Sequence, residues 1–294
     1  MKYRGGRYLK WMVVLIIVST AVYVSQTDLQ PPNGGTWQGY VLGTVGALLI
    51  LWLTALGIVK RRYAGSNVQG WTSAHIYLGL SLLVVATLHC AGQFGWNVHT
   101  LAYVLMCFVI GSGIYGLVFY LRYPQKLARN RLNASRQKLF AELSELNEQG
   151  IALANQCHVN VRTAVDTAIA RTSIGGGLWD QLTGRDRSSV VLLRAKDDGD
   201  NQNRQQTKAI ANTDQATIID YVAKCIPRAR KKGESTNLQE LLNIVCRRQA
   251  VTRQIREDIK LQSRLKVWLW VHVPATMGLL AALSIHIVSV FFYW

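Results

Sequence analysis

Three long stretches of this chain contain no lysine or arginine, and they most constrain how it can fold. These stretches are residues 11–59, 63–121 and 267–294. They hold five apolar segments, at about 11–25, 39–59, 71–92, 100–121 and 267–293. A helix of about 20 apolar residues crosses the roughly 30 Å hydrocarbon core of a bilayer. The last four segments reach that length. The first is shorter, but no small-residue cleavage site follows it, so we expect it to be retained. The sequence therefore predicts five membrane-spanning helices.

A formal net charge of +17 would suit a nucleic-acid-binding protein, but the distribution of charge favours a membrane protein. Of the 33 basic residues, 26 lie between Arg122 and Lys266, and the loops at 26–38 and 93–99 have none. Basic loops stay in the cytoplasm. We therefore expect a multi-pass protein of a bacterial-type inner membrane that binds no nucleic acid. Its N-terminus and its 123–265 insert would be cytoplasmic and its C-terminus extracytoplasmic.

Four of the six histidines lie inside the apolar segments, in two pairs with the same spacing. His75 and His89 are 14 residues apart in the third segment, and His272 and His286 are 14 apart in the fifth. Fourteen helical residues make nearly four turns and about 21 Å, so each pair shares one helix face. The third and fifth helices run in the same direction, which brings His75 level with His272 and His89 level with His286. Each level then offers one imidazole for each face of an iron porphyrin.

A histidine in a membrane helix can also serve a purely structural purpose. A single one is more often an interhelical hydrogen-bonding contact than a metal ligand, whereas two pairs of identical spacing favour ligands. A zinc or di-iron site is disfavoured, because no Asp or Glu lies in any apolar segment. His99 begins the fourth segment and has no partner at ligand spacing on its own helix. We therefore expect His99 not to be a ligand.

This histidine pattern on two parallel helices resembles the dihaem cytochrome b of quinol–cytochrome c reductases. It is also similar to the membrane domain of ferric reductases and NADPH oxidases, in which the third and fifth helices carry the ligands. The resemblance covers the second to fifth segments, and the ligand pattern is its specific part. It implies electron transport through two haem b groups stacked across the bilayer. His75 and His272 would then be axial ligands of the inner haem iron, and His89 and His286 of the outer one.

The chain departs from these families in three respects. It has no dinucleotide-binding glycine fingerprint or large C-terminal flavin domain, no evident quinol-site signature, and a long insert before the fifth helix. We therefore expect an electron-transfer subunit of an oxidoreductase complex rather than an autonomous enzyme. Expected partners are membrane lipids, quinone, and redox subunits such as a cytoplasmic flavoprotein or iron–sulfur protein or an extracytoplasmic cytochrome. Two alternatives stay open: a quinol-reactive membrane anchor subunit, and a non-redox membrane anchor or scaffold.

The expected fold is all-α, a five-transmembrane-helix bundle binding two haems. Helices 1–4 would occupy residues 1–122, a mainly helical soluble insert 123–265, and the helix completing the bundle 266–294. Within the insert, apolar residues at helical spacing predict helices over 127–148 and near 217–226. Residues 173–216 have the glycine-rich and polar composition of a long flexible loop. No proline occurs between Pro227 and Pro274, so a single helix is expected to run from the insert into the fifth span.

Overall fold

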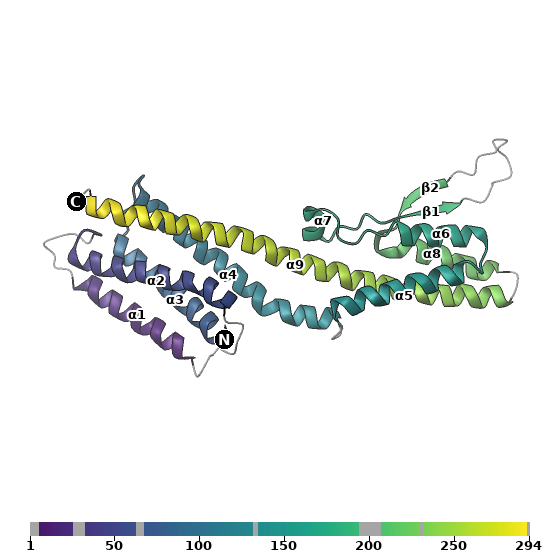
Figure 1. Cartoon of the computed structure of the whole chain (residues 1–294), viewed down its shortest axis with the longest axis horizontal. Coiled ribbons are helices and arrows are strands. Elements are labelled where there is room, and N and C mark those ends of the chain that lie inside the picture. Colours follow the sequence, from purple (N-terminus) through teal and green to yellow (C-terminus); the bar gives the residue numbers. More distant parts are fainter. Residues whose placement is uncertain are drawn as a thin grey trace. The chain divides into compact units, whose positions relative to one another are not determined.

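The computed structural model describes residues 6–25, 33–62, 68–131, 135–193, 207–229 and 232–292. These residues are mostly helical, and the chain divides into two compact units (Figure 1). We call Met1–Phe119 together with Val267–Trp294 the apolar unit, and Tyr120–Lys266 the polar unit.

The apolar unit consists of long helices. It contains α1 (Arg7–Val24), α2 (Trp37–Arg62), α3 (Val68–Cys90), most of α4 (Val98–Arg131) and the second half of α9 (Lys232–Phe292). Helix α3 contacts both α1 and α2. By length and composition, five of the helices that the structure describes could cross a membrane. The predicted set of long apolar helices suited to a membrane bundle is therefore confirmed.

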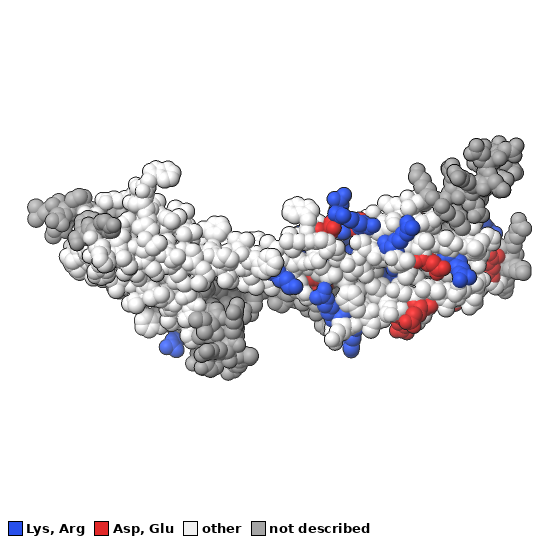
Figure 2. Space-filling view, turned by 45° about the horizontal axis from the view of Figure 1, so that its top comes forward, with Lys and Arg blue, Asp and Glu red and all other residues white. Residues whose placement is uncertain are grey.

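Many large apolar side chains of this unit are exposed, among them Ile17, Leu48 and Met277. In water a contiguous apolar surface of this extent is unfavourable, whereas lipid tails are as apolar as the side chains themselves. Figure 2 shows the contrast: the visible surface of the apolar unit is almost entirely white, and blue and red side chains gather over the polar unit. The structure thus supports contact of the apolar unit with membrane lipid.

A buried cluster inside the apolar unit joins four of its helices. Its members are Ile50 and Leu53 of α2, Leu82 of α3, Met106 of α4, and Leu279 and Leu283 of α9. Helices α3 and α9, which carry the paired histidines, therefore pack in the same core.

The polar unit combines helices with one hairpin. In chain order it contains α5 (Arg136–Ala154), α6 (Val159–Ala170), α7 (Leu178–Thr183), β1 (Ser189–Leu193), β2 (Thr207–Ala211), η2 (Thr213–Gln215), α8 (Ala216–Cys225), η3 (Ile226–Arg228) and the first half of α9. The strands pair antiparallel, with Val191 opposite Ala209. One core lies among α6, α8, β1 and α9, and a second is formed by α5 and α9.

The expectation of a flexible loop over 173–216 is wrong for much of that range. It contains α7, both strands and η2, while residues 194–206 lie outside the described part of the chain. Strand β1 is ordered by packing, because Val190 is fully buried and the Val191 backbone N–H donates to Thr167 Oγ1 of α6 at 3.1 Å. Short strands of this kind depend on tertiary contacts that local composition does not report.

The predicted helices of the insert are partly confirmed. Helix α8 matches the helix expected near 217–226. The single helix expected over 127–148 is instead the end of α4 and the start of α5. Helix α5 begins after Ser135, whose side-chain oxygen accepts a hydrogen bond from the Lys138 backbone N–H at 3.2 Å. This N-cap satisfies a backbone donor that a helix start leaves free.

Helix α9 is continuous for 61 residues, which confirms the prediction of one helix running from the insert into the fifth span. Its first half supplies Leu238, Leu241 and Val245 to one core of the polar unit. Its second half passes through Pro274 and carries His272 and His286.

Candidate functional site

The structure brings His89 of α3 and His286 of α9 together. Their ring centroids lie 6.0 Å apart and the ring planes are nearly perpendicular, at 76°. These are the two histidines expected at one level from the matched spacing. Their role as ligands stays a prediction.

The His89 ring is held against a glycine surface of α2. Its Nδ1 lies 2.8 Å from the Gly39 carbonyl oxygen. A carbonyl oxygen can only accept, so Nδ1 carries the proton and the lone pair is on Nε2. A Cβ atom on Gly43 would lie 2.8 Å from His89 Cε1, closer than carbon atoms pack. Gly43 therefore makes room for the imidazole, whereas a Cβ atom on Gly39 would instead meet the backbone of Asn33 and Gly34.

His99 is a site residue that the sequence-based reasoning missed. Its Nδ1 hydrogen-bonds to Nδ1 of His286, and the ring centroids are 4.4 Å apart. One of these nitrogens must donate and the other accept, so the contact fixes the tautomers of both rings relative to each other. The signal available in the sequence was its position at the same end of the bundle as His89 and His286. Spacing on one helix does not reveal a contact between α4 and α9.

The His272 ring is oriented by a chain of contacts from α4. Its Nδ1 lies 2.8 Å from Ser112 Oγ, and the Ser112 hydroxyl donates its only hydrogen to the Val109 carbonyl at 2.8 Å. The His272 Nδ1 must therefore be the donor, which leaves the lone pair on Nε2. Trp268 packs against the ring at 5.3 Å and donates from Nε1 to the Ser112 carbonyl oxygen at 2.8 Å. Ser112 and Trp268 thus fix the imidazole from two sides.

His75 differs from the other three. Its Nδ1 is buried and has no hydrogen-bonding partner in the part of the chain that the structure describes. Buried polar atoms are nearly always bonded to protein, water or a ligand. The Nδ1 atom of His75 is thus the nitrogen of this ring that remains available to a further partner.

The separation of the His89 and His286 rings can be compared with the separation that one shared metal would impose. Among the described residues, no group of three or more His, Cys, Asp or Glu side chains could hold a metal ion. Metal–imidazole bonds of about 2.0–2.1 Å, with ring radii of about 1.2 Å, put two centroids roughly 6.4 Å apart across one metal. The 6.0 Å between His89 and His286 is close to that separation. His89 and His272 also have the protonated Nδ1 and free Nε2 typical of metal-ligating histidines.

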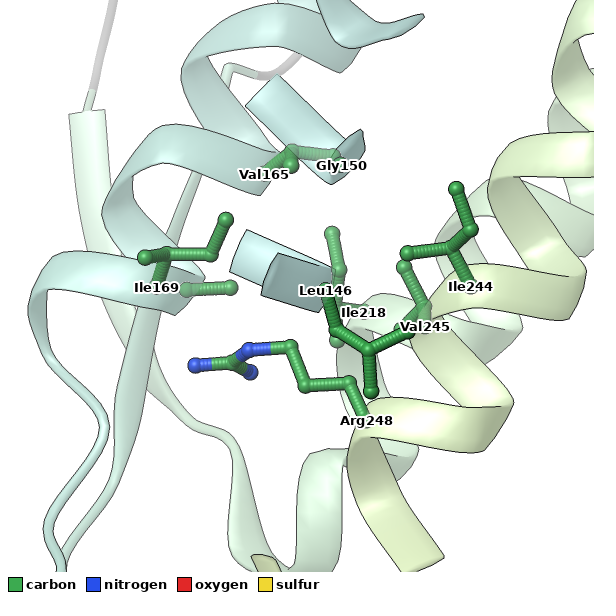
Figure 3. Close-up of a pocket in the computed structure, with 9 residues that line it drawn as sticks. Leu146, Gly150, Val165, Ile169, Ile218, Ile244, Val245 and Arg248 are labelled. Atoms are coloured by element: carbon green, nitrogen blue, oxygen red, sulfur yellow. The ribbon is translucent and has the colours of Figure 1, made fainter. Parts of the chain in front are cut away.

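The polar unit has a buried arginine of its own. Arg248 of α9 is only 3% exposed, and it donates to Asn147 Oδ1 at 2.7 Å and to Gln215 Oε1 and Thr172 Oγ1 at 2.6 Å. Burial, with the nearby charge of Arg256, lowers the pKa of Arg248 to about 10. Figure 3 shows its side chain extending from α9 across a small cavity beside Ile169. The cavity measures about 10 Å³, room for one water molecule. We assign Arg248 a structural role.

A second arginine, Arg256, holds the residues that precede β1. Arg256 of α9 contacts Asp186 through Nη1 at 2.7 Å and donates from Nη2 to Ser188 Oγ at 3.0 Å. Burial alone would raise the pKa of Asp186, but hydrogen bonds from Ser188 and Asp214 and the Arg256 charge hold it below its usual value. The pair therefore ties the hairpin and η2 to the long helix.

No family model, no curated protein and no solved structure matches this chain. The resemblance to dihaem cytochromes therefore depends on the histidine pattern alone.

Proposed function

We propose that the protein transfers electrons across a membrane through two b-type haems, each held between one histidine of α3 and one of α9. His75 and His272 would hold the iron of one haem, and His89 and His286 that of the other. When bound, such a haem supplies reversible one-electron oxidation and reduction of its iron. The four histidines would supply the nitrogens that hold the iron. The hydrogen bonds of His89 to Gly39 and of His272 to Ser112 would orient their rings and tune the haem.

The observation that carries this proposal is the pairing of His89 with His286. The two rings lie near the separation that one metal would impose, and Nδ1 of each is engaged by Gly39 or His99. His89 donates from Nδ1 to the Gly39 carbonyl, which leaves its Nε2 available. The Nε2 of His286 would be available when His286 is the donor to His99, and both hydrogen bonds hold the orientation of their rings. Repetition of the pattern one membrane level away, at His75 and His272, supports a second haem.

The chain would act as one subunit of a larger oxidoreductase complex. The basic residues of the polar unit favour its placement on the cytoplasmic side of a bacterial-type inner membrane. A cytoplasmic flavoprotein or iron–sulfur protein would then reach the site of His75 and His272, and an extracytoplasmic cytochrome that of His89 and His286. Quinone is the further candidate donor or acceptor.

The test is an optical spectrum with haem quantitation on the full chain purified in detergent. We expect a reduced b-type absorbance band and two haems per chain. His89→Ala and His286→Ala are each expected to remove the same single haem. His158→Ala is the matched control, because His158 caps α6 in the polar unit and accepts from the Asn160 N–H. Absence of the band, or full haem content in both site variants, would refute the proposal.

A non-redox membrane anchor is the second candidate, and two contacts favour it. The His99–His286 and Ser112–His272 hydrogen bonds join α4 to α9 without any cofactor. Polar side chains commonly stabilise helix–helix packing in membranes in this way. Under this alternative, His286→Ala would lower the thermal stability of the detergent-solubilised protein, which would contain no haem. The same spectrum therefore separates the two candidates.

A further inference from the structure

Helix α7 of the polar unit exposes its large apolar side chains and buries its acidic one, the reverse of what a water-soluble surface helix usually does. Leu178 is 53% exposed and the adjacent Trp179 is 71% exposed, whereas Asp180 on the same short helix is only 7% exposed. Asp180 forms an ion pair within the polar unit, because its Oδ1 lies 2.8 Å from Arg187 Nη2. A helix that buries its acid and exposes its tryptophan presents an apolar surface to something outside the polar unit.

Helix α7 is fixed on one short segment of α9 (Figure 1). The Ser263 hydroxyl donates to Gln181 Oε1 at 3.0 Å, and Arg264 Nε donates to the Leu182 carbonyl oxygen at 3.3 Å. The side chain of Lys260 lies against Gly184, where an added Cβ atom would be 3.1 Å from Lys260 Cδ. These contacts hold Leu178 and Trp179 in a set position.

The docking segment directly precedes the fifth apolar span. Ser263 is four residues before Val267, about 6 Å along the helix axis. The headgroup layer on each side of a bilayer is about 5–7 Å thick, from a total of about 40–45 Å around a core of about 30 Å. With Val267 at the start of the hydrocarbon core, Ser263 would lie in the headgroup layer, where tryptophan side chains concentrate in membrane proteins.

The charges around α7 suit anionic lipid headgroups. Arg185, Arg264 and Lys266 are exposed, and Arg187 is also exposed but is paired with Asp180. The acids nearest to them are neutralised within the fold: Asp180 contacts Arg187, Asp186 contacts Arg256, and Glu257 contacts Lys260. Basic side chains next to a membrane span are attracted to the anionic cytoplasmic leaflet.

We propose that α7 is an interfacial anchor. Leu178 and Trp179 insert among the headgroups of the same membrane that α9 crosses, and the surrounding arginines bind anionic lipid phosphates. The anchor would hold the polar unit to the bilayer in addition to α4 and α9, the two helices that connect it to the apolar unit. This proposal needs the membrane span of α9 but no haem, so it stands or falls independently of electron transfer.

The experiment places a fluorescent label at position 179 and measures what quenches it. Trp179→Cys is made in the full chain with the five native cysteines replaced by alanine, and the protein is reconstituted in vesicles of phosphatidylcholine and phosphatidylglycerol. Val159→Cys is the matched control, because Val159 is 59% exposed on α6 of the same unit. Quenchers are a headgroup-linked nitroxide lipid and aqueous iodide.

We expect the label at 179 to be quenched several-fold more by the nitroxide lipid than the label at 159, and to be protected from iodide. Vesicles of phosphatidylcholine alone should weaken the lipid quenching at 179. Iodide quenching equal at both positions would overturn the proposal, since α7 would then face water. Protection from both quenchers would also overturn it, because a protein surface would be covering α7. Equal lipid quenching in both kinds of vesicle would refute the role of the arginines.

Discussion

Gly43→Ala tests the position of the His89 ring without removing any polar group. The added Cβ atom would lie 2.8 Å from His89 Cε1 and 3.1 Å from Nδ1. Carbon atoms in contact are about 3.5–4.0 Å apart, so the imidazole would have to move by roughly 0.7 Å. Ligand distances in a metal site tolerate only about 0.2 Å. The same movement would stretch the 2.8 Å hydrogen bond from Nδ1 to the Gly39 carbonyl.

The expected result is loss of one haem. Haem content measured by alkaline pyridine extraction, relative to protein, should fall from two to one per chain in Gly43→Ala. Helix propensity works in the opposite direction, because alanine stabilises a helix by about 1 kcal/mol relative to glycine. A loss of haem would therefore report the displaced ring and not a damaged α2.

Gly46→Ala on the same helix is the control. Its added Cβ atom would meet Leu82 Cδ1 at 3.9 Å and Val85 Cγ1 at 4.0 Å, which is ordinary contact. We expect this variant to keep both haems. Two haems with an unchanged spectrum in Gly43→Ala would contradict the assignment of His89 as a ligand held against α2.

Three further predictions concern the contacts around the site and within the polar unit. His99→Ala removes the partner of His286 Nδ1, and we expect about 10–100-fold weaker haem binding at that level, measured by haem titration of the depleted protein. Arg248→Ala removes three hydrogen bonds, to Asn147, Gln215 and Thr172, at about 1–3 kcal/mol each less the relief of a buried charge. Amide hydrogen exchange in α6 should therefore accelerate. Asp186 has a lowered pKa in the folded protein, so its stabilising effect is present above its unfolded pKa of about 3.9 and is lost as pH falls through the folded value. In the wild-type protein, the β1–β2 hairpin should therefore lose protection from amide hydrogen exchange at the acidic end of a titration from neutral pH to about pH 3. In Asp186→Asn, Arg256 lacks its partner charge, so the hairpin should be weakly protected at every pH.

The apolar helices could be predicted from the sequence because they depend only on residues that are consecutive in the chain. A span needs only uninterrupted apolar residues, and the absence of Lys and Arg from 63–121 shows two of them directly. The continuity of α9 was predictable for a similar reason, since no proline interrupts the chain between Pro227 and Pro274. The proximity of His89 to His286 was predictable because the two histidine pairs have the same spacing and their helices run in the same direction.

The features that sequence reasoning missed depend on contacts between elements. Strand β1 is stabilised by the burial of Val190 and by Thr167 of α6, and neither is visible in a five-residue apolar run. His99 entered the site because α4 and α9 approach each other at one end, which no spacing within α4 encodes. Ser112 was missed likewise: a serine in an apolar helix is common, and only its position beside His272 gives it a role.

Helix α9 is one continuous helix that carries both core residues of the polar unit and two of the paired histidines. Val251 and Ile255 are locked in a core of the polar unit, and the same helix carries His272 without an intervening loop. Side chains reach about 5–6 Å from a helix axis, so a twist of roughly 10° moves an imidazole by about 1 Å. His272 lies before Pro274 and His286 after it, and a proline removes one hydrogen bond from the helix. The two histidines of α9 therefore lie on opposite sides of the turn at which this helix has lost a hydrogen bond, so a bend at Pro274 would change the position of one relative to the other.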